Sequence, residues 1–366
     1  MPQTTIRDVP TPALIVDLVK THANIQSIAD YARSHGIDYR PHTKTHKSVR
    51  IASMQKEVGA VGLTAAKVGE AQVFADVYDD LLIAYPALDR ARTGPLARLA
   101  QTHTVRVAVD SALAVESLAA AAKTEDVTIG ILVDIDTGGH RTGLQTPQLA
   151  LDLAQLSDRT AGARFDGLFT YLGHVHEPPD QQGPSLAASN AILQETLDLY
   201  KDSGLACPIV SGGSSPTALQ THLMPAVNDL RCGMNVYQDR GLVENGYARR
   251  EQCAASVVCT VVSNAVPDKC VLDAGSKALT QDLIRGDKRR GHGVIVEYPD
   301  ATITHLTEEH AEVNLSGCAR RPKLAERVTI IPNHICPVVN LFDHAWARDG
   351  GDELEPMPTE ARGKLS

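Results

Sequence analysis

The chain has 366 residues, with 35 Lys and Arg against 44 Asp and Glu, so its formal net charge at pH 7 is −9. Hydrophobic residues make up 43% and charged residues 22%, proportions that are typical of a globular protein and exclude global disorder. The acidic balance argues against a nucleic-acid-binding protein, because phosphate binding requires a concentrated basic surface. No apolar run approaches the ~20 residues of a membrane span, and the first residues lack the basic and apolar blocks of a signal peptide, so we do not expect export by that route. We therefore expect a cytoplasmic protein without nucleic-acid or membrane partners.

Short β-branched runs alternate with helix-period stretches over the first 245 or so residues. The clearest predicted helix runs from Thr21 to His35 and stops at Gly36. Strands that alternate with helices predict a parallel sheet, and eight of them favour a closed (β/α)₈ barrel over an open sheet. The predicted strands are Ala13–Val16, Tyr39–Thr43, Val61–Thr64, Leu81–Ala84, Val105–Val109, Thr128–Val133, Gly167–Tyr171 and Ile209–Val210.

After about Gly246 the pattern changes to strands and turns without convincing helices, which indicates a separate β-rich domain. The tail from Arg348 to Ser366 is rich in Gly, Pro and charge and predicts a loosely ordered terminus. The seven cysteines are an odd number without a C-x-x-C pair and indicate reduced thiols. The predicted strands here are Ala255–Val262, Cys270–Asp273, Gly293–Val296, Glu312–Leu315 and Val328–Ile331.

The densest polar cluster, Arg40-Pro41-His42-Thr43-Lys44-Thr45-His46-Lys47, ends the second predicted strand. On an extended strand, residues two apart share a face, so Arg40, His42, Lys44 and His46 would point the same way. Charged groups inside a barrel mouth would be costly without a ligand, because buried charges need partners. A solvated basic loop is the alternative, and composition alone supports both interpretations equally.

Three further clusters end predicted strands, where the active sites of barrel enzymes are built. Asp134 to Gly143 closes the sixth strand with Asp136, three glycines and Arg141, although an ordinary capped turn would look similar. Tyr171, His174 and His176 end the seventh strand, where they could contact a cofactor ring or be surface residues. The Ser211–Pro216 loop follows the eighth strand, where small residues can leave backbone N–H groups open to phosphate.

The last candidate is His334-Ile335-Cys336 in the β-rich part. On an extended chain these two side chains face one way and could bind one divalent ion, for which nitrogen and sulfur donors favour Zn²⁺. Two protein ligands leave coordination positions open for water or substrate, as a catalytic site requires. A His-x-Cys pair of unrelated core or turn residues is the commoner alternative.

Together these motifs resemble the fold-type III pyridoxal-phosphate enzymes related to alanine racemase, specifically the branch with D-serine dehydratase and D-threonine aldolase. The resemblance spans nearly the whole chain. It rests on Thr11-Pro-Ala-Leu14, the Arg40–Lys47 block, Asp136-x-Gly-x-x-Arg141-x-Gly143, Gly173-His174, Ser211-Gly-Gly213, and His334-x-Cys336 followed by Asn340-Leu341.

The resemblance implies a barrel over residues 19–245 and a β domain of residues 1–18 plus 246–366, because the family's first strand joins the β domain. It implies that Lys44 is the Schiff-base lysine and that His334 and Cys336 are catalytic metal ligands. It also implies a homodimer that acts on D-amino acids. The residues implied at the cofactor are Lys44, His42, Arg141, Tyr171, His174, the cradle Ser211, Gly212, Gly213 and Ser214, and Tyr237.

Two reactions of β-hydroxy D-amino acids remain open. Dehydration would give a 2-oxo acid and ammonia, whereas retro-aldol cleavage would give glycine and an aldehyde. The family's dehydratases carry His-x-Cys and its D-threonine aldolases tend to have a carboxylate at the third position, so Cys336 favours a D-serine-type dehydratase. The thiolate favours zinc, with Mn²⁺ or Mg²⁺ as alternatives. A racemase, which needs no metal, and a shorter non-catalytic cofactor carrier are more distant alternatives.

Overall fold

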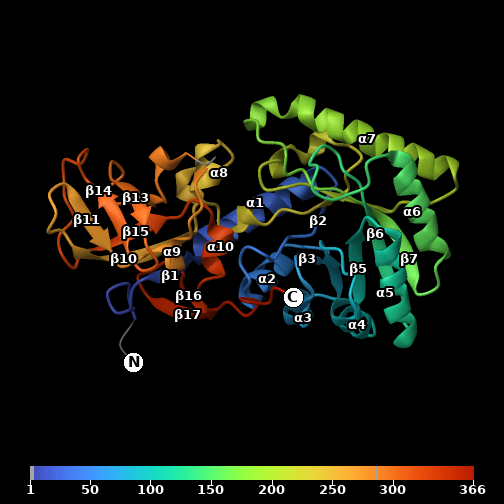
Figure 1. The fold of residues 1–366 in the computed structure, drawn as a ribbon, viewed down its shortest axis with the longest axis horizontal. Helices are drawn as coiled ribbons and strands as arrows, with labels where there is room; N and C mark the ends of the chain where they lie inside the picture. Colours follow the sequence, from blue (N-terminus) through green and yellow to red (C-terminus); the bar gives the residue numbers. More distant parts are fainter. Residues whose placement is uncertain (1–3, 285–286) are drawn as a thin grey trace. The chain divides into compact units, whose positions relative to one another are not determined.

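The structure is a computed structural model that describes residues 4–284 and 287–366 (Figure 1). The chain divides into two compact units. The barrel unit consists of Gln26–Lys44, Ile51–Gly233 and Gly363–Ser366, and the β unit consists of Met1–Ile25, Thr45–Arg50 and Met234–Arg362. Among the described helices, none is long and apolar enough to cross a membrane.

The barrel unit contains an eight-stranded parallel sheet in the order β2-β9-β8-β7-β6-β5-β4-β3. Backbone hydrogen bonds join its two end strands: the Val61 N–H donates to the Tyr39 carbonyl, and the Thr43 N–H donates to the Thr64 carbonyl, both at 2.9 Å. The predicted closed barrel is confirmed. Its strands are β2 (Asp38–Tyr39), β3 (Leu63–Ala65), β4 (Asp80–Ile83), β5 (Thr104–Val109), β6 (Ile129–Asp134), β7 (Ala163–Phe169), β8 (Ile209–Gly212) and β9 (Asp229–Leu230).

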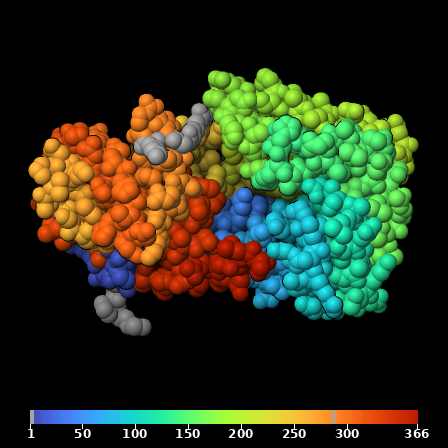
Figure 2. All heavy atoms as spheres, viewed as in Figure 1, coloured from blue at the N-terminus to red at the C-terminus, as the bar shows by residue number. Residues whose placement is uncertain are grey.

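Helices connect the barrel strands of this unit, which is coloured mostly cyan to green in the space-filling view (Figure 2). The N-terminus of α6 is fixed by Thr146, whose hydroxyl accepts a hydrogen bond from the Leu149 N–H, and by Pro147 in the first turn. The predicted helix over residues 21–35 corresponds to α1. The helices are α1 (Leu18–Ser34), α2 (Val49–Glu57), α3 (Val68–Phe74), α4 (Arg90–Leu99), α5 (Ala112–Thr124), α6 (Pro147–Arg159) and α7 (Gly183–Asp202).

A network of buried ion pairs forms the floor of the barrel, at the amino ends of the strands. Arg40 is only 4% exposed and donates to Asp229 at 2.8 Å and to Asp80 at 2.6 Å. Arg106 also contacts Asp80, and its Nε donates to Asp166 at 2.7 Å. The charge of Arg40 therefore has protein partners and needs no ligand. This corrects the expectation that all charged groups of the Arg40–Lys47 block would need a ligand inside the barrel.

Two glycines give these ion pairs the space to cross the sheet. A Cβ at Gly62 would lie 2.2 Å from Arg40 Nη1, and one at Gly130 would lie 2.2 Å from Asp166 Oδ2. Because real Cβ contacts are never so short, the missing side chains let Arg40 pass the start of β3 and let the Arg106–Asp166 pair cross β6. Above this floor, Leu82, Ala108, Leu132 and Phe169 form an apolar cluster.

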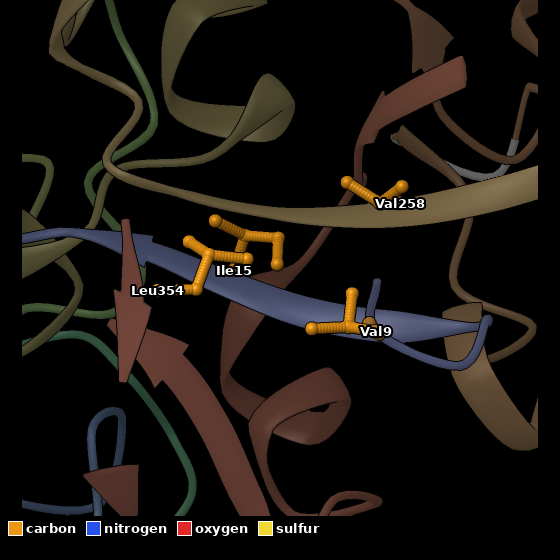
Figure 3. Packing of buried hydrophobic residues seen from close by; sticks show 5 residues of the cluster. Val9, Ile15, Val258 and Leu354 are labelled. Atoms are coloured by element: carbon orange, nitrogen blue, oxygen red, sulfur yellow. The ribbon is translucent and has the colours of Figure 1, made fainter. Parts of the chain in front are cut away.

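The β unit contains a nine-stranded sheet with the central order β13-β14-β11-β10-β1-β16-β17; off this order, β15 pairs with β10, and β12 pairs with β15. Figure 3 shows its core around β1 and β10, where Val9, Ile15, Val258 and Leu354 pack together. The elements of this unit are β1 (Ala13–Asp17), α8 (Arg240–Glu244), β10 (Ala255–Ser263), β11 (Lys269–Leu272), α9 (Ser276–Leu279), β12 (Val294–Ile295), β13 (Thr302–Leu306), β14 (Ala311–Asn314), β15 (Arg327–Ile331), α10 (Ile335–Val339), β16 (His344–Arg348) and β17 (Leu354–Pro358).

Two predictions are wrong, one from the strand pattern and one from the composition of the tail. The segment Ala13–Val16 is not a barrel strand, because β1 pairs with β10 and β16, as the family resemblance implied; the eighth barrel strand is the two-residue β9. The tail after Arg348 is not loosely ordered, because β17 pairs antiparallel with β16. Its buried apolar residues Leu354 and Met357, which are 3% and 1% exposed, are three positions apart and lie among charged residues, so no strand alternation is visible in the sequence.

Candidate active site

Lys44 lies in a turn, not on a strand. Strand β2 ends at Tyr39, and residues 43–46 form a turn that Thr43 fixes to β3 through its N–H and its hydroxyl, both of which bond to the Thr64 carbonyl. The backbone N–H of Lys44 lies 3.4 Å from His42 Nδ1. The strand alternation predicted for His42, Lys44 and His46 is therefore wrong, although His42 and Lys44 remain close neighbours.

The amine of Lys44 has no carboxylate partner in the described part of the chain, whereas Arg40 nearby in sequence is fully ion-paired. The lysine is partly exposed at the carboxyl end of β2. Barrel enzymes build their active sites at this end of the strands. An unpaired amine in this place is available for covalent bonding to a ligand.

The loop after β6 is organised by the carboxylate of Asp136. Its Oδ1 accepts hydrogen bonds from the backbone N–H groups of Gly138, Gly139 and His140 at 2.7–3.1 Å. Burial raises the pKa of Asp136, but hydrogen bonds from Gly138, His140 and other donors outweigh this effect and lower it to about 2. Asp136 is therefore a fixed anion that shapes the loop, as in the capped-turn interpretation.

This loop meets the residues that follow β7. The Arg141 guanidinium lies over the Tyr171 ring at 4.4 Å, a cation–π contact. Both residues line a cavity of about 160 Å³. A Cβ at Gly138 would lie 2.9 Å from His174 Nε2, so glycine makes room for the imidazole. The remaining residues that line the cavity are Asp134, Ile135, Asp136, Gly139, Thr142 and Gly173.

The loop after β8 has its hydroxyl groups engaged but a backbone amide free. The Ser211 hydroxyl bonds to Asp229 and accepts a hydrogen bond from Arg231 Nε at 2.7 Å, and Ser214 bonds to Thr217. Gly213 is buried with a φ of +96°, and its N–H has no hydrogen-bond partner in residues 4–284 and 287–366. A buried unpaired amide is costly, and a phosphate oxygen could accept from it.

Three groups of the barrel unit fit the parts of pyridoxal phosphate, the cofactor that the family uses. The barrel unit offers the Lys44 amine, the Gly213 amide and the His174 imidazole, and none of Lys44 Nζ, Gly213 N–H and His174 Nδ1 has a partner among the residues that the structure describes. Burial lowers the pKa of His174, so the ring is neutral at neutral pH. An amine, an unpaired N–H and a neutral aromatic ring suit the aldehyde, phosphate and ring of this cofactor.

Asp134, at the end of β6, makes the free energy of unfolding depend on pH. Burial raises its pKa to about 6 from an ordinary 3.8. The folded protein therefore binds this proton more tightly than the unfolded chain, and stability falls as pH rises from 4 to 6. Asp134→Asn should remove a cost on the order of 3 kcal/mol at pH 7, with little effect at pH 4. Urea unfolding of both proteins between pH 4 and 7 measures this difference.

Asp136→Asn is the matched control in the same loop. Because the pKa of Asp136 is lowered to about 2, its carboxylate stabilises the folded state above the unfolded pKa of 3.8. The two variants should therefore shift stability at pH 7 in opposite directions. Equal shifts in one direction would contradict the assignment for Asp134.

In the β unit, the structure brings His334 and Cys336 together, but not on an extended chain. His334 precedes α10 as its N-cap residue, and Cys336 belongs to the first turn of that helix. The predicted strand geometry is therefore wrong, yet the two side chains still hydrogen-bond. His334 Nδ1 lies 2.9 Å from Asp282 Oδ2, and Cys336 Sγ lies 3.0 Å from the Thr45 hydroxyl.

A single buried carboxylate anchors the His334–Cys336 segment. Asp239 is 1% exposed; one of its oxygens caps α8 through the Leu242 N–H at 2.9 Å, and the other accepts from the Ile335 N–H at 3.1 Å. Burial lowers the pKa of His334, but hydrogen bonding and charge from Cys336, with the nearby Asp239, outweigh this and raise it to about 9. A nitrogen and a sulfur donor in hydrogen-bond contact suit one soft divalent cation.

The described residues contain no group of three or more His, Cys, Asp or Glu that could hold a metal ion. A cation at His334 and Cys336 would therefore keep open positions. Tyr237 lies in the same unit, fully buried, and burial raises its pKa above the usual range. Thr45, Asp239 and Asp282 are contacts of this segment for which the sequence pattern gives no signal.

The fold defines the class: a closed barrel with a lysine in the turn after its first strand, followed by a β unit, is an alanine racemase-like fold. Residues 16–241 match the family described as alanine racemase, N-terminal domain, and residues 254–347 match the putative serine dehydratase domain. The chain belongs to this family of pyridoxal-phosphate enzymes with a dehydratase-type C-terminal domain. The predicted family, fold and lyase class are confirmed.

Three curated relatives span nearly the whole chain. A 3-hydroxy-D-aspartate aldolase of Paracoccus denitrificans (strain Pd 1222) is 30% identical and covers 98% of this chain and 93% of its own. A D-threo-3-hydroxyaspartate dehydratase of Delftia sp. (strain HT23) is 31% identical, with 95% and 97% covered. A D-serine dehydratase of Dictyostelium discoideum is 24% identical, with 92% and 93% covered.

Solved structures of related enzymes are also similar to this chain over nearly its whole length. A D-threonine aldolase from Filomicrobium marinum has a TM-score of 0.92 and 29% identity over 100% of both chains. Variants of the D-threo-3-hydroxyaspartate dehydratase in which a histidine or, two residues later, a cysteine is replaced by alanine have a TM-score of 0.90 at 27% identity. The structure of the cysteine variant is described as the metal-free form and covers 98% of this chain and 99% of its own.

Proposed function

We propose that this protein is a pyridoxal-phosphate- and metal-dependent lyase of β-hydroxy D-amino acids, most simply a dehydratase of the D-serine dehydratase type. The observation that carries this proposal is the contact between His334 and Cys336, a nitrogen and a sulfur donor that leave coordination positions open. A metal site with open positions can polarise a substrate oxygen, which a simple racemase does not need.

In the proposed site, Lys44 would hold the cofactor through Nζ, and its amine would move the proton of the substrate Cα. Pyridoxal phosphate, when bound, supplies an electron sink for the negative charge that develops at this carbon. The Gly213 amide is available to the phosphate, while the neutral His174 and the Tyr171–Arg141 pair are available to the ring. His42 stays next to the lysine backbone.

His334 and Cys336 would hold the divalent cation, which supplies Lewis acidity toward a β-hydroxyl group when bound. The thiolate donor favours Zn²⁺ over Mn²⁺ or Mg²⁺. Asp239 keeps the two donors in place without taking part in chemistry.

D-Threonine aldolase-type cleavage is the second candidate. It is favoured by relatives that are named aldolases at 30% identity, and it would require removal of the hydroxyl proton instead of the Cα proton. The dehydratase is favoured because the relative with the histidine and cysteine variants, two residues apart, is a dehydratase. A non-catalytic carrier does not account for the β unit and its donor pair.

Product analysis tests the proposal. The holoenzyme with Zn²⁺ is incubated with D-serine, D-threonine and 3-hydroxy-D-aspartate, and 2-oxo acid, ammonia, glycine and aldehyde are measured. We expect 2-oxo acid and ammonia in equal amounts, with activity lost on chelation. Glycine with aldehyde would establish the aldolase instead, and amino-acid racemisation that survives chelation would overturn both lyase assignments.

A further inference from the structure

His334 and Cys336 each make a further contact with a residue that is not proposed to bind the metal. On the histidine, Nδ1 lies 2.9 Å from Asp282 Oδ2. On the cysteine, Sγ lies 3.0 Å from the Thr45 hydroxyl. Neither Asp282 nor Thr45 has a role in the function proposed above.

The contact with Asp282 decides which nitrogen of His334 can bind a metal. A carboxylate accepts a hydrogen bond, so Nδ1 must carry a proton; when the ring gives up its other proton to bind a metal, the free lone pair lies on Nε2. The Asp282 segment is fixed to the donor segment, because the Asn333 side-chain amide donates to the carbonyls of Asp282 at 2.9 Å and of Gly291 at 2.8 Å. Asn333 is 5% exposed and directly precedes His334.

The contact with Thr45 acts on the other donor. A thiolate cannot donate a hydrogen bond, so in the metal-binding form of Cys336 the Thr45 hydroxyl is the donor. Thr45 is fully buried, so water does not compete for this bond. The hydroxyl stabilises the thiolate and fixes the direction of its lone pairs.

We propose that Asp282 and Thr45 are positioning residues of the metal site: Asp282 selects the Nε2 donor of His334, and Thr45 supports the Cys336 thiolate. This inference rests on the proposed function only in so far as His334 and Cys336 bind a divalent cation. It adds the prediction that the affinity for the cation depends on two residues that do not coordinate it. Partners of this kind affect metal affinity by about 10–100-fold when they are removed.

Zn²⁺ affinity tests the role of Asp282, measured by competition with a chromophoric chelator and without amino-acid substrate. Asp282→Ala should weaken binding about 10–100-fold. Asp268→Asn is the matched control, because Asp268 is an exposed, ion-paired carboxylate of the same unit, and it should bind Zn²⁺ like wild type. Asp282→Asn serves if the alanine variant does not fold, and imidazole ¹⁵N shifts of Zn²⁺-loaded wild type should show protonated Nδ1 on His334.

Binding by Asp282→Ala within twofold of wild type would overturn the role of Asp282 and leave the proposed function standing. If His334→Ala binds Zn²⁺ with wild-type affinity, His334 is not a metal ligand, and both the proposed function and this inference are refuted. The two failures are therefore distinguishable.

The cobalt spectrum tests Thr45. In Co²⁺-loaded protein, Thr45→Val should move the thiolate-to-cobalt charge-transfer band to lower energy, because the sulfur lone pair loses a hydrogen bond, whereas Thr45→Ser should keep the wild-type band. Coincident bands in all three proteins would overturn the role of Thr45. Absence of the band in wild type would show that Cys336 is not a ligand, which would refute the proposed metal pair as well.

Discussion

Lys44→Ala should give a folded but colourless protein without measurable lyase activity. The amine at residue 44 is the group that we propose to bind the cofactor covalently and to move the substrate proton. Its loss removes both functions, so we expect turnover to fall by at least about 10³-fold. Visible absorbance after saturation with pyridoxal phosphate measures the covalent bond, and product formation measures turnover.

Lys67→Ala is the matched control for this experiment. Lys67 is also partly exposed, follows the neighbouring strand β3 and lies 3.4 Å from the centroid of the Tyr85 ring. The control should keep the visible band. Colour that persists in Lys44→Ala, or disappears only in Lys67→Ala, would refute the assignment of the Schiff-base lysine.

Alanine at His334 or Cys336 should separate the metal from the cofactor. Both variants should lose the bound cation and keep the visible cofactor band, because Gly213, His174 and Tyr171, which we propose at the cofactor, belong to the barrel unit. Loss of Lewis acidity is worth several kcal/mol, so turnover should fall by about 10²–10⁴-fold. Metal content by atomic spectroscopy, together with the absorbance spectrum, measures both effects.

Cys318→Ala provides the control, because Cys318 is another partly exposed thiol of the β unit. It should retain both metal and turnover. Full activity in metal-free His334→Ala or Cys336→Ala would show that the cation has no catalytic role, whatever its occupancy.

The sequence predicted the barrel because short β-branched strand segments alternate regularly with helix-period segments along the chain. The same periodicity placed Ala13–Val16 in the wrong sheet, since a strand pattern does not state which sheet the strand joins. Strand β9 escaped detection because it is two residues long and begins with Asp229, which is paired with Arg40 inside the barrel. Partners 189 residues apart leave no local signal.

The candidate site was predictable where chemistry concentrates in short motifs, as at Lys44 and at His334 with Cys336. The local geometry was not, because tertiary contacts determine it: Thr43 bonds to β3 and turns the chain before Lys44, and Asp239 starts a helix where an extended chain was expected. Asp282 lies 52 residues before His334 and shows no spacing that would link the two. The homodimer implied by the resemblance stays a prediction.

The glycine gaps in the barrel have a consequence for how this sequence can change. A side chain at Gly62 would collide with Arg40, and one at Gly130 would collide with the Arg106–Asp166 pair. Substitutions of each glycine and of the charged residues beside it are therefore coupled. Replacing one of these residues alone should destabilise the fold more than replacing the glycine and its charged neighbours together. Homologous barrels that fill either gap should have neutral residues in place of the crossing charges, and an engineered library should vary these positions jointly.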